Sequence, residues 1–460
     1  MKIKTLITSF NLLFFFANGV SQNNDSITIR KLYDYYLTNS NCYSNLNFLT
    51  TKIGGRLSGS QQAKKAVEWA KKAMYSAGAD TVILQPCMVP HWERGKKEIC
   101  RLQSTSLKLN SLLNCVALGS SVGTGKLGIT AKVIEIKNFE ELEYLGEKII
   151  KGNIVFYNVF FDQTKIRTGN AYGETVKYRS RGASMAAKYG AVASLVRSMT
   201  SVADNEPHTG NMNYDTSICK VKIPTLAISY IAANELAESL KKDNKLTLYI
   251  ETHCQTLNDE PSFNVVGQIN GSEKINEFII AGGHLDSWDN GQGAHDDGAG
   301  IVQTIEIISA FKKLGIKPKH NIRAVAFMNE ENGLAGGKAY AQYAQSHQEK
   351  HIAALETDAG GFTPRSFGVD TIKGLYRLAA TWKNLFSPYL IDKIEKEGGG
   401  ADISALKELG VPCIGFEPDT QRYFDIHHTA ADTFDKINKR ELELGAGGIG
   451  ALIYLIDKYY

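Results

Sequence analysis

Residues 281–300 read AGGHLDSWDNGQGAHDDGAG and place His284, Asp286 and Asp296 among several glycines. The apolar run 278–281 before them is typical of a buried parallel strand, and the apolar spacing after them predicts an amphipathic helix. The expected unit is strand, loop, helix. Ligands bind at the carboxyl ends of the strands in an open α/β sheet, so we expect His284 to lie where chemistry takes place.

Taken alone, this stretch also fits a glycine-rich turn whose aspartates cap the next helix. The rest of the chain favours a functional site, because further side chains of the same kind follow other apolar runs. They are Glu330 and Glu331 after residues 322–328, Asp358 after residues 352–355, and His428 with Asp432 near the C-terminus. Acids scattered at random along a sheet would not concentrate at strand ends in this way.

Length, charge and cysteine content limit the possible folds and functions. The 460 residues exceed one ordinary core, which predicts two domains or one large domain with an insertion. A formal net charge of +4 leaves no electrostatic footprint for nucleic acid. The seven cysteines include no CxxC pair and are odd in number, so they are interpreted as buried small hydrophobes or as one or two bridges.

The N-terminus has the pattern of a leader. Lys2 and Lys4 precede the apolar run 6–17, and small residues follow it. This pattern predicts a signal peptide over residues 1–21, cleaved after Ser21, and a protein that is exported to the periplasm or secreted. A bilayer-spanning helix needs roughly 20 apolar residues, and no later run is long enough, so we expect no membrane span.

The remaining chain divides into three parts. Residues 22–115 are expected to form the N-terminal part of an α/β domain that residues 254–460 complete, and they include a helix over residues 61–77 with Ser60 as its N-cap. Residues 116–253 change character to short β-rich runs and include His208 in the turn PHTG, without a cluster of acids. Residues 254–460 return to alternating strands and helices. The predicted fold is a mixed sheet flanked by helices, with an inserted β-rich domain.

The acids and histidines fit one dinuclear site. Such a site needs a bridging carboxylate, a further ligand for each metal, and a base for the water between the ions. Carboxylate oxygens and imidazole nitrogens suit zinc. The candidates are His284, Asp296, Glu330, Glu331, Asp358 and His428.

In their order along the chain these motifs resemble the co-catalytic di-zinc aminopeptidase and carboxypeptidase family. The resemblance covers most of the mature chain and rests on the ordered set IGGRLSGS, GASMAAKYGAVASLVRS, PHTG, GGHLDSWDNGQGAHDDGAG, NEENG, ALETDAGGFTP, GGGADIS and YFDIHHTAADT. It implies two zinc ions per chain. His284 and Asp358 would bind one zinc, Glu331 and His428 the other, and Asp296 would bridge them.

The resemblance also assigns supporting roles. It makes Glu330 the general base and acid. Asp286 is expected to accept a hydrogen bond from the first histidine ligand, and Asp432 to support the loop of the second. Asp297 belongs to an Asp-Asp pair whose peptide bond is often cis in this family. His427 stands where several of these carboxypeptidases have a tyrosine that donates to the oxyanion, and an imidazole can donate in its place.

The resemblance implies that the inserted domain is a protease-associated domain that covers the active site. His208 is then a candidate substrate contact, or else an ordinary turn residue. A covered dinuclear site fits short substrates, which predicts exopeptidase cleavage of dipeptides or short peptides. The family likeness adds a homodimer to the expectations.

Other readings stay open at this point. An aminopeptidase acting on longer peptides, a carboxypeptidase and a dipeptidase share the same metal ligands. A catalytically inactive receptor ectodomain or a single-zinc glutaminyl cyclase could use the same scaffold, but the complete ligand set argues against both. The sequence contains no GxSxG motif for a serine nucleophile.

Overall fold

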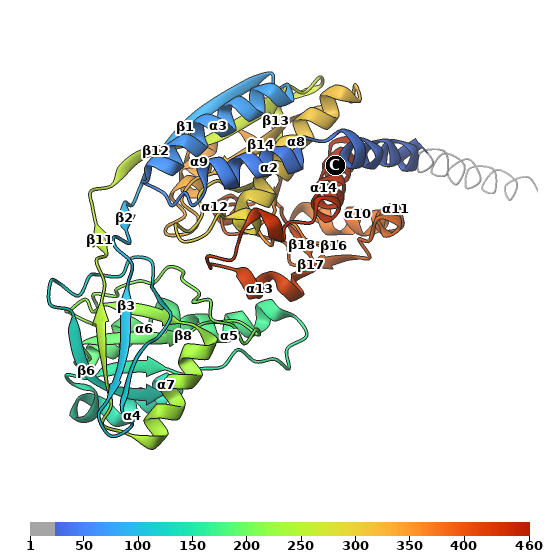
Figure 1. Ribbon diagram of the computed structural model, residues 1–460. Coiled ribbons are helices and arrows are strands. Elements are labelled where there is room, and N and C mark those ends of the chain that lie inside the picture. The colour runs from blue at the N-terminus through green and yellow to red at the C-terminus, as the bar shows by residue number, and fades with distance from the viewer. Residues whose placement is uncertain (1–23) are drawn as a thin grey trace, which may run out of the picture.

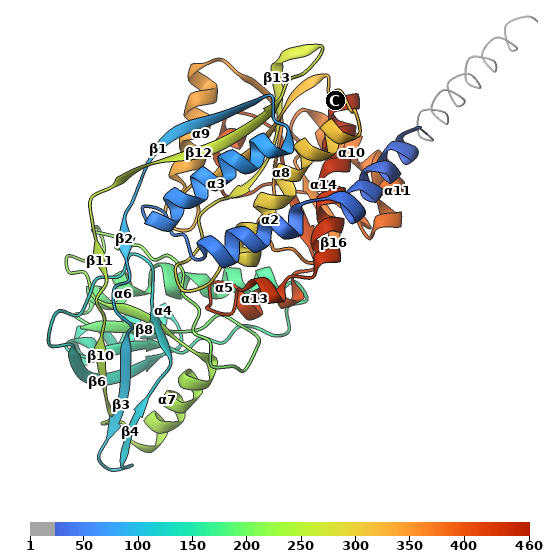
Figure 2. The same ribbon diagram turned by 45° about the horizontal axis from the view of Figure 1, so that its top comes forward.

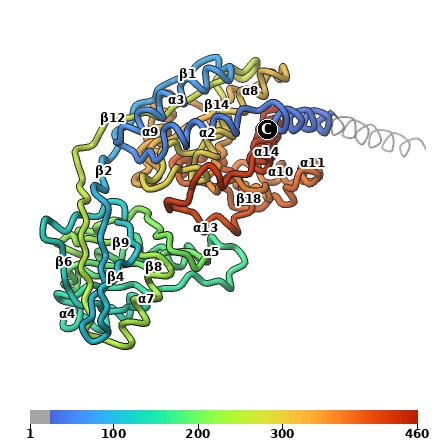
Figure 3. The backbone as a smooth tube through the Cα atoms, in the orientation of Figure 1, coloured from blue at the N-terminus to red at the C-terminus, as the bar shows by residue number. Residues whose placement is uncertain are grey.

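The computed structural model describes residues 24–460, so the predicted signal peptide lies outside the described residues. Two mixed sheets form two units, which are connected by the short antiparallel pair β2 (Trp92–Glu93) and β11 (Gln255–Thr256) (Figures 1 and 3). We call residues 94–254, which lie between these two strands, the inserted unit, and the rest of the described chain the peptidase unit.

The sheet of the peptidase unit has the strand order β1-β12-β14-β13-β15-β18-β16-β17. Its strands are β1 (Thr81–Val89), β12 (Glu260–Ile269), β13 (Lys274–His284), β14 (His320–Phe327), β15 (Lys350–Glu356), β16 (Pro364–Val369), β17 (Lys393–Lys396) and β18 (Cys413–Pro418). The central strands β13, β14 and β15 are parallel, and β1 and β12 are antiparallel to their neighbours. This confirms the expected mixed α/β fold.

Helices cover both faces of this sheet. One face is covered by residues 24–39, α2 (Cys42–Phe48), α3 (Gln61–Ala77), α8 (Ala299–Lys313) and α14 (Lys439–Tyr459). The other is covered by α9 (Ala335–Ser346) and α12 (Ser404–Glu408) (Figures 1 and 2). Alternate residues of β14 pack into the cores on opposite faces of the sheet. Ala324 and Ala326 face the helices that include α8, and Val325 and Phe327 face α9 and α12. Burial on both faces explains why the central strands are continuous apolar runs.

The inserted unit has its own sheet, with the order β4-β3-β10-β6-β7-β8-β9-β5. Its strands are β3 (Ile99–Ser104), β4 (Leu109–Leu112), β5 (Cys115–Ala117), β6 (Ile129–Ile136), β7 (Ile154–Tyr157), β8 (Ala193–Arg197), β9 (Thr225–Ile228) and β10 (Thr247–Glu251). Helix α7 (Tyr230–Lys242) packs on one face; α4 (Phe139–Ile150) and α6 (Gly182–Lys188) pack on the other, and α5 (Thr168–Ser180) precedes α6.

The inserted sheet begins upstream of the expected boundary at residue 116. Strand β3 buries alternate residues, including Cys100 and Leu102, in the core beneath α7. Its partner is β10, in which Ile250 pairs with Cys100. The pairing joins segments about 150 residues apart, so local sequence pattern does not reveal it.

Local expectations held in the peptidase unit. The Ser60 hydroxyl accepts a hydrogen bond of 3.1 Å from the Ala63 N–H at the start of α3, which confirms the predicted N-cap. Within residues 24–460, all seven cysteines are free thiols. In the same residues, no helix has both the length and the apolar character needed to cross a bilayer.

Candidate metal centre

Three neighbouring parallel strands deliver the predicted ligands to one edge of the sheet. His284 is the last residue of β13, Glu330 and Glu331 follow β14 after a short turn, and Asp358 follows β15. Because β13 pairs in parallel with both β14 and β15, their carboxyl ends lie together. His428 arrives from the loop after the short helix α13 (Tyr423–Ile426).

Asp296 lies at the centre of these side chains. Its Oδ1 is 3.0 Å from His284 Nε2, and its Oδ2 is 3.2 Å from His428 Nε2. On the first side, Asp358 Oδ1 lies 3.4 Å from His284 Nε2. On the second, Glu331 Oε2 lies 3.2 Å from His428 Nε2. The structure therefore brings all five predicted ligands together: the two oxygens of Asp296 face different histidines, and each of these histidines has a second acid beside it.

Several of these atoms lack hydrogen-bond partners among the described residues. His284 Nε2, Asp296 Oδ2 and Asp358 Oδ1 are buried and make no hydrogen bond. Buried polar atoms are ordinarily paired, and lone pairs that face one another need a donor or a cation between them. Nitrogen and carboxylate oxygen are the ligands that zinc accepts. The donor set therefore fits metal ions.

The charges of the cluster shift its pKa values strongly. Although burial opposes ionisation, the close imidazoles of His284 and His428 hold the pKa of Asp296 well below its ordinary value. Burial and the Asp296 charge raise the pKa of Glu331 to about 7. Against the effect of burial, Glu331 and Asp296 raise the pKa of His428 to about 10. The cluster thus favours positive charge at its centre, supplied either by protons or by metal ions.

The adjacent acids Glu330 and Glu331 differ in exposure. Glu331 is buried and turned toward His428, whereas Glu330 is half-buried. Burial and the neighbouring charges of Asp358 and Glu331 raise the pKa of Glu330 well above its ordinary value. A carboxyl group of this kind, beside the metal ligands but outside their ion pairs, can accept and release a proton.

Asp286 accepts the predicted hydrogen bond from His284 through its backbone carbonyl and not through its carboxylate. His284 Nδ1 donates to the backbone carbonyl of Asp286 at 3.0 Å, while the Asp286 Oδ1 atom lies 4.0 Å away. The carboxylate instead accepts the backbone N–H groups of Asn329, Glu330 and Glu331 at 2.7, 3.1 and 3.4 Å. Asp286 therefore fixes the tautomer of His284 through its backbone and the turn of the two glutamates through its side chain.

Two further aspartates hold the backbone around Asp296. The Asp432 carboxylate accepts the N–H groups of His295 at 2.8 Å and of Asp296 at 3.1 Å, so it ties the His428 loop to the central ligand. Asp297 accepts the His284 N–H at 3.0 Å. The peptide bond between Asp296 and Asp297 is cis, as expected.

His427 and His208 both approach the cluster. The His427 ring stacks on His428 with 3.6 Å between centroids, and its Nε2 lies 3.7 Å from Asp296 Oδ2. Burial and the charge of His428 lower the pKa of His427 well below its ordinary value, so the ring is neutral. The same causes lower the pKa of His208 to about 3. Both ring nitrogens of His208 are buried without a hydrogen-bond partner in the described chain.

Arg56 is a residue whose role the sequence did not reveal. Its side chain is fully buried and donates to the carbonyls of Leu285, Gln292 and Gly293 at 2.6, 2.8 and 3.0 Å. It thus shapes the loop between His284 and Asp296. The only signal in the sequence was an arginine among the glycine and serine residues of IGGRLSGS.

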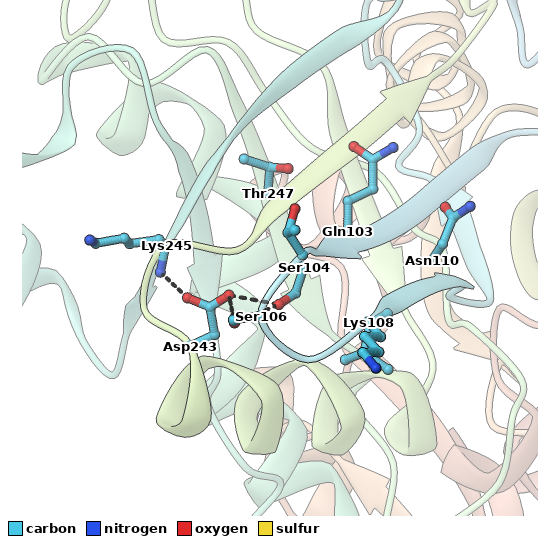
Figure 4. Close-up of a pocket in the computed structure, with 10 residues that line it drawn as sticks. Gln103, Ser104, Ser106, Lys108, Asn110, Asp243, Lys245 and Thr247 are labelled. Carbon is cyan, nitrogen blue, oxygen red and sulfur yellow. Dashed lines mark hydrogen bonds between the residues drawn. The ribbon is translucent and has the colours of Figure 1, made fainter.

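A hollow of about 830 Å³ lies on the inserted unit beside β3, β4 and β10, and none of the predicted metal ligands line it. The one carboxylate in its wall, Asp243, accepts hydrogen bonds from Ser104 Oγ, Ser106 Oγ and the Lys245 N–H (Figure 4). These bonds hold the pKa of Asp243 below its ordinary value. The carboxylate is already satisfied, so it offers no group for chemistry.

The comparisons with known proteins agree with this geometry. The model of peptidase family M28 matches residues 264–449, which contain every predicted metal ligand. Mouse carboxypeptidase Q is 33% identical over 457 residues, covering 96% of this chain and 93% of its own length. The human protein of that name is 34% identical over 414 residues, covering 90% of this chain and 84% of its own.

This chain belongs to peptidase family M28. It is therefore a metallo-exopeptidase, as the sequence predicted. A solved structure of a peptidase M28 precursor from Shewanella amazonensis superposes with a TM-score of 0.89 at 32% identity, covering 95% of this chain and 97% of the other. The zinc aminopeptidase of Bacillus subtilis shares the fold, with a TM-score of 0.65 at 20% identity, covering 90% of this chain and 94% of its own.

Proposed function

We propose that this protein is a di-zinc exopeptidase that hydrolyses dipeptides or short peptides. The observation that carries the proposal is Asp296, whose two carboxylate oxygens face different histidines, each with a second acid beside it. A carboxylate in this position can bridge two cations. His284 and Asp358 would complete one zinc site, and Glu331 and His428 the other.

Two zinc ions held here would polarise the scissile carbonyl and lower the pKa of the attacking water. Glu330 takes the proton from that water and later delivers it to the leaving amine. Its half-buried carboxyl group is attached to the same turn as Glu331, and Asp286 holds that turn through three backbone hydrogen bonds. The fixed turn separates the two roles, because one carboxylate faces His428 while its neighbour remains available to substrate.

His427 is the proposed donor to the oxyanion. Its ring is neutral, and its Nε2 points toward the cluster at 3.7 Å from Asp296 Oδ2. One donor to a developing oxyanion is typically worth about 3 kcal/mol. His427→Ala should therefore lower kcat on a dipeptide about 100-fold with little change in zinc content. An unchanged kcat would make His427 a packing residue.

The inserted unit packs against the candidate metal centre, which supports a short substrate. The inserted unit acts as a protease-associated lid in this proposal, and His208, with its two unpartnered ring nitrogens, is its candidate substrate contact. The likeness to carboxypeptidase Q supports dipeptides as the substrate class.

A substrate panel tests the proposal. Zinc-loaded mature protein should cleave unblocked dipeptides faster than aminoacyl anilides, and should not cut within long peptides blocked at both ends. Faster cleavage of longer unblocked peptides from the N-terminus would favour the aminopeptidase alternative. Efficient internal cleavage would refute exopeptidase action. Zinc binding without any hydrolysis would favour a binding ectodomain.

Export and dimerisation are also part of this proposal. Export is supported by the pattern of the leader and dimerisation by the family likeness, and both can be measured on expressed protein. N-terminal sequencing of the mature protein should begin at Gln22. Light scattering should give twice the mass of the chain.

A further inference from the structure

One turn of the inserted unit, residues 207–210, reaches a proposed metal ligand directly. The Thr209 N–H donates to the His428 carbonyl at 2.9 Å. In return, His428 Nδ1 lies 3.3 Å from the Thr209 carbonyl oxygen. The two residues are 219 positions apart in sequence, and this reciprocal pair of hydrogen bonds joins the two units at the metal centre.

Two groups of the inserted unit lie at His428 Nδ1: the Thr209 carbonyl oxygen at 3.3 Å and Arg179 Nη1 at 3.4 Å. A carbonyl oxygen can only accept, so the Thr209 contact is a hydrogen bond when Nδ1 carries a proton, and Nε2 is then the nitrogen left to bind a metal. His428 Nε2 lies 3.2 Å from both Asp296 Oδ2 and Glu331 Oε2. A metal-binding histidine usually gains its orientation from a partner on its other nitrogen, and here the partner comes from the inserted unit.

The backbone of His428 also needs this support. Its φ is +60°, in the left-handed region that residues other than glycine rarely occupy. Such a conformation persists only where surrounding contacts stabilise it. The hydrogen bond from Thr209 to the His428 carbonyl is a contact of this kind, made from outside the loop.

The turn itself is closely fitted against His428. The Thr209 hydroxyl donates to the Ala117 carbonyl at 2.8 Å, which anchors the turn to β5. Gly210 has φ of +132°, and a Cβ atom there would lie 2.7 Å from His428 Nδ1 and would overlap the guanidinium of Arg179. Arg179 Nη1 is itself 3.5 Å from the Thr209 carbonyl. Only glycine leaves room for this approach.

Apolar contacts on both sides of the turn hold the two units together. Trp92 and Trp288 pack with Ala117 on one side. On the other, Phe161 and Ala171 of the inserted unit pack in one cluster with Phe362, Tyr423 and Phe424 of the peptidase unit. The contact between Thr209 and His428 thus lies within a built interface.

We propose that the inserted unit is a structural part of the second metal site. Thr209 is a positioning residue that orients His428 through its backbone, so docking of the inserted unit and metal binding by Glu331 and His428 stabilise each other. This coupling rests on the proposed di-zinc function. Because linkage is reciprocal, an inserted unit that docks poorly lowers metal affinity, and loss of metal loosens the docking.

The first test compares two glycine substitutions in the inserted unit. Gly210→Ala should weaken zinc binding at one of the two sites about 10- to 100-fold, as is usual when the partner of a metal-binding histidine is disturbed. The other site should keep its affinity. Gly173→Ala is the matched control, because a Cβ at Gly173 would meet nothing within 4 Å. Zinc is measured by competition with a chromogenic chelator. Wild-type affinity at both sites of Gly210→Ala would refute the coupling.

The second test uses the unaltered chain, so it does not depend on the folding of a variant. In the unaltered chain, removing zinc should accelerate hydrogen exchange at the Thr209 amide. In the control His428→Ala, removing zinc should leave the exchange rate of this amide unchanged. Equal exchange with and without zinc would overturn the inference. If the unaltered chain binds fewer than two zinc ions, the di-zinc function fails; if it binds two and Gly210→Ala matches it, only the coupling fails.

Discussion

At the scale of single residues, Asp296 decides whether the cluster is one site or two. Its two oxygens face different histidines, so Asp296→Ala should remove a ligand from both metals. We expect elemental analysis to find almost no zinc in this variant. Asp358→Ala is the control: its carboxylate lies on the His284 side alone, so about one zinc should remain. One zinc retained in Asp296→Ala would show that this residue does not bridge.

Glu330 and Glu331 separate proton transfer from metal binding. Glu330→Gln keeps the size of the side chain but removes its basicity, so kcat on a dipeptide should fall by about 100- to 10,000-fold. Two zinc ions should remain bound, because Glu330 forms no ion pair with the histidines and is not assigned as a ligand. If zinc and activity were lost in parallel, the roles of the two glutamates would have to be exchanged.

The chemical roles of the site residues could be predicted from the sequence more fully than their contacts. Strand ends that carry acids and histidines indicated the metal centre, because residue type and position suffice for that inference. The partners of Asp286 could not be inferred, since its carboxylate binds backbone N–H groups of a turn more than 40 residues away. A sequence shows side chains but not which backbone groups remain free to donate.

At the scale of elements, the loop between β13 and α8 depends on Arg56. This side chain donates to three loop carbonyls from a fully buried position. Arg56→Met should destabilise the fold by at least about 3 kcal/mol, because three buried carbonyls lose their donor. Urea denaturation measures the change. Exposed Arg30 is the control, and Arg30→Met should leave the midpoint nearly unchanged. Equal midpoints for the two variants would contradict the role given to Arg56.

Elements with a local signal were predicted well, and those defined by distant pairing were not. The helix after Ser60 and the strand before Asn329 follow from periodicity and capping. The assignment of β3 to the inserted sheet follows only from its pairing with β10. Arg56 stands out locally as an arginine among glycine and serine residues, but only the fold shows that the loop carbonyls surround it.

At the scale of the whole molecule, metal binding and stability should be linked through pH. Burial raises the pKa values of Glu331, Glu356 and Asp432 to about 7, against about 4 in an unfolded chain. Between these values the folded, metal-free protein holds protons that the unfolded chain has released, so its stability falls as pH rises. His428, with its pKa raised to about 10, acts in the same direction above pH 6.5.

Zinc competes with the protons on Glu331 and His428, because it binds the deprotonated ligands. The difference in Tm between zinc-loaded and zinc-stripped protein should therefore widen from pH 5 to pH 8. Differential scanning calorimetry at fixed free zinc measures it, with Asp296→Ala as the control that shows no difference at either pH. A difference that stays constant or narrows over this range would contradict a metal centre formed by these residues.

The central claim is that two metal ions lie on either side of Asp296. Anomalous diffraction at the zinc edge from crystals of the zinc-loaded protein tests it most directly. We predict two peaks: one bound by His284 and Asp358, the other by Glu331 and His428, with one oxygen of Asp296 on each. A single peak, or a second peak without Asp296 among its ligands, would contradict the account.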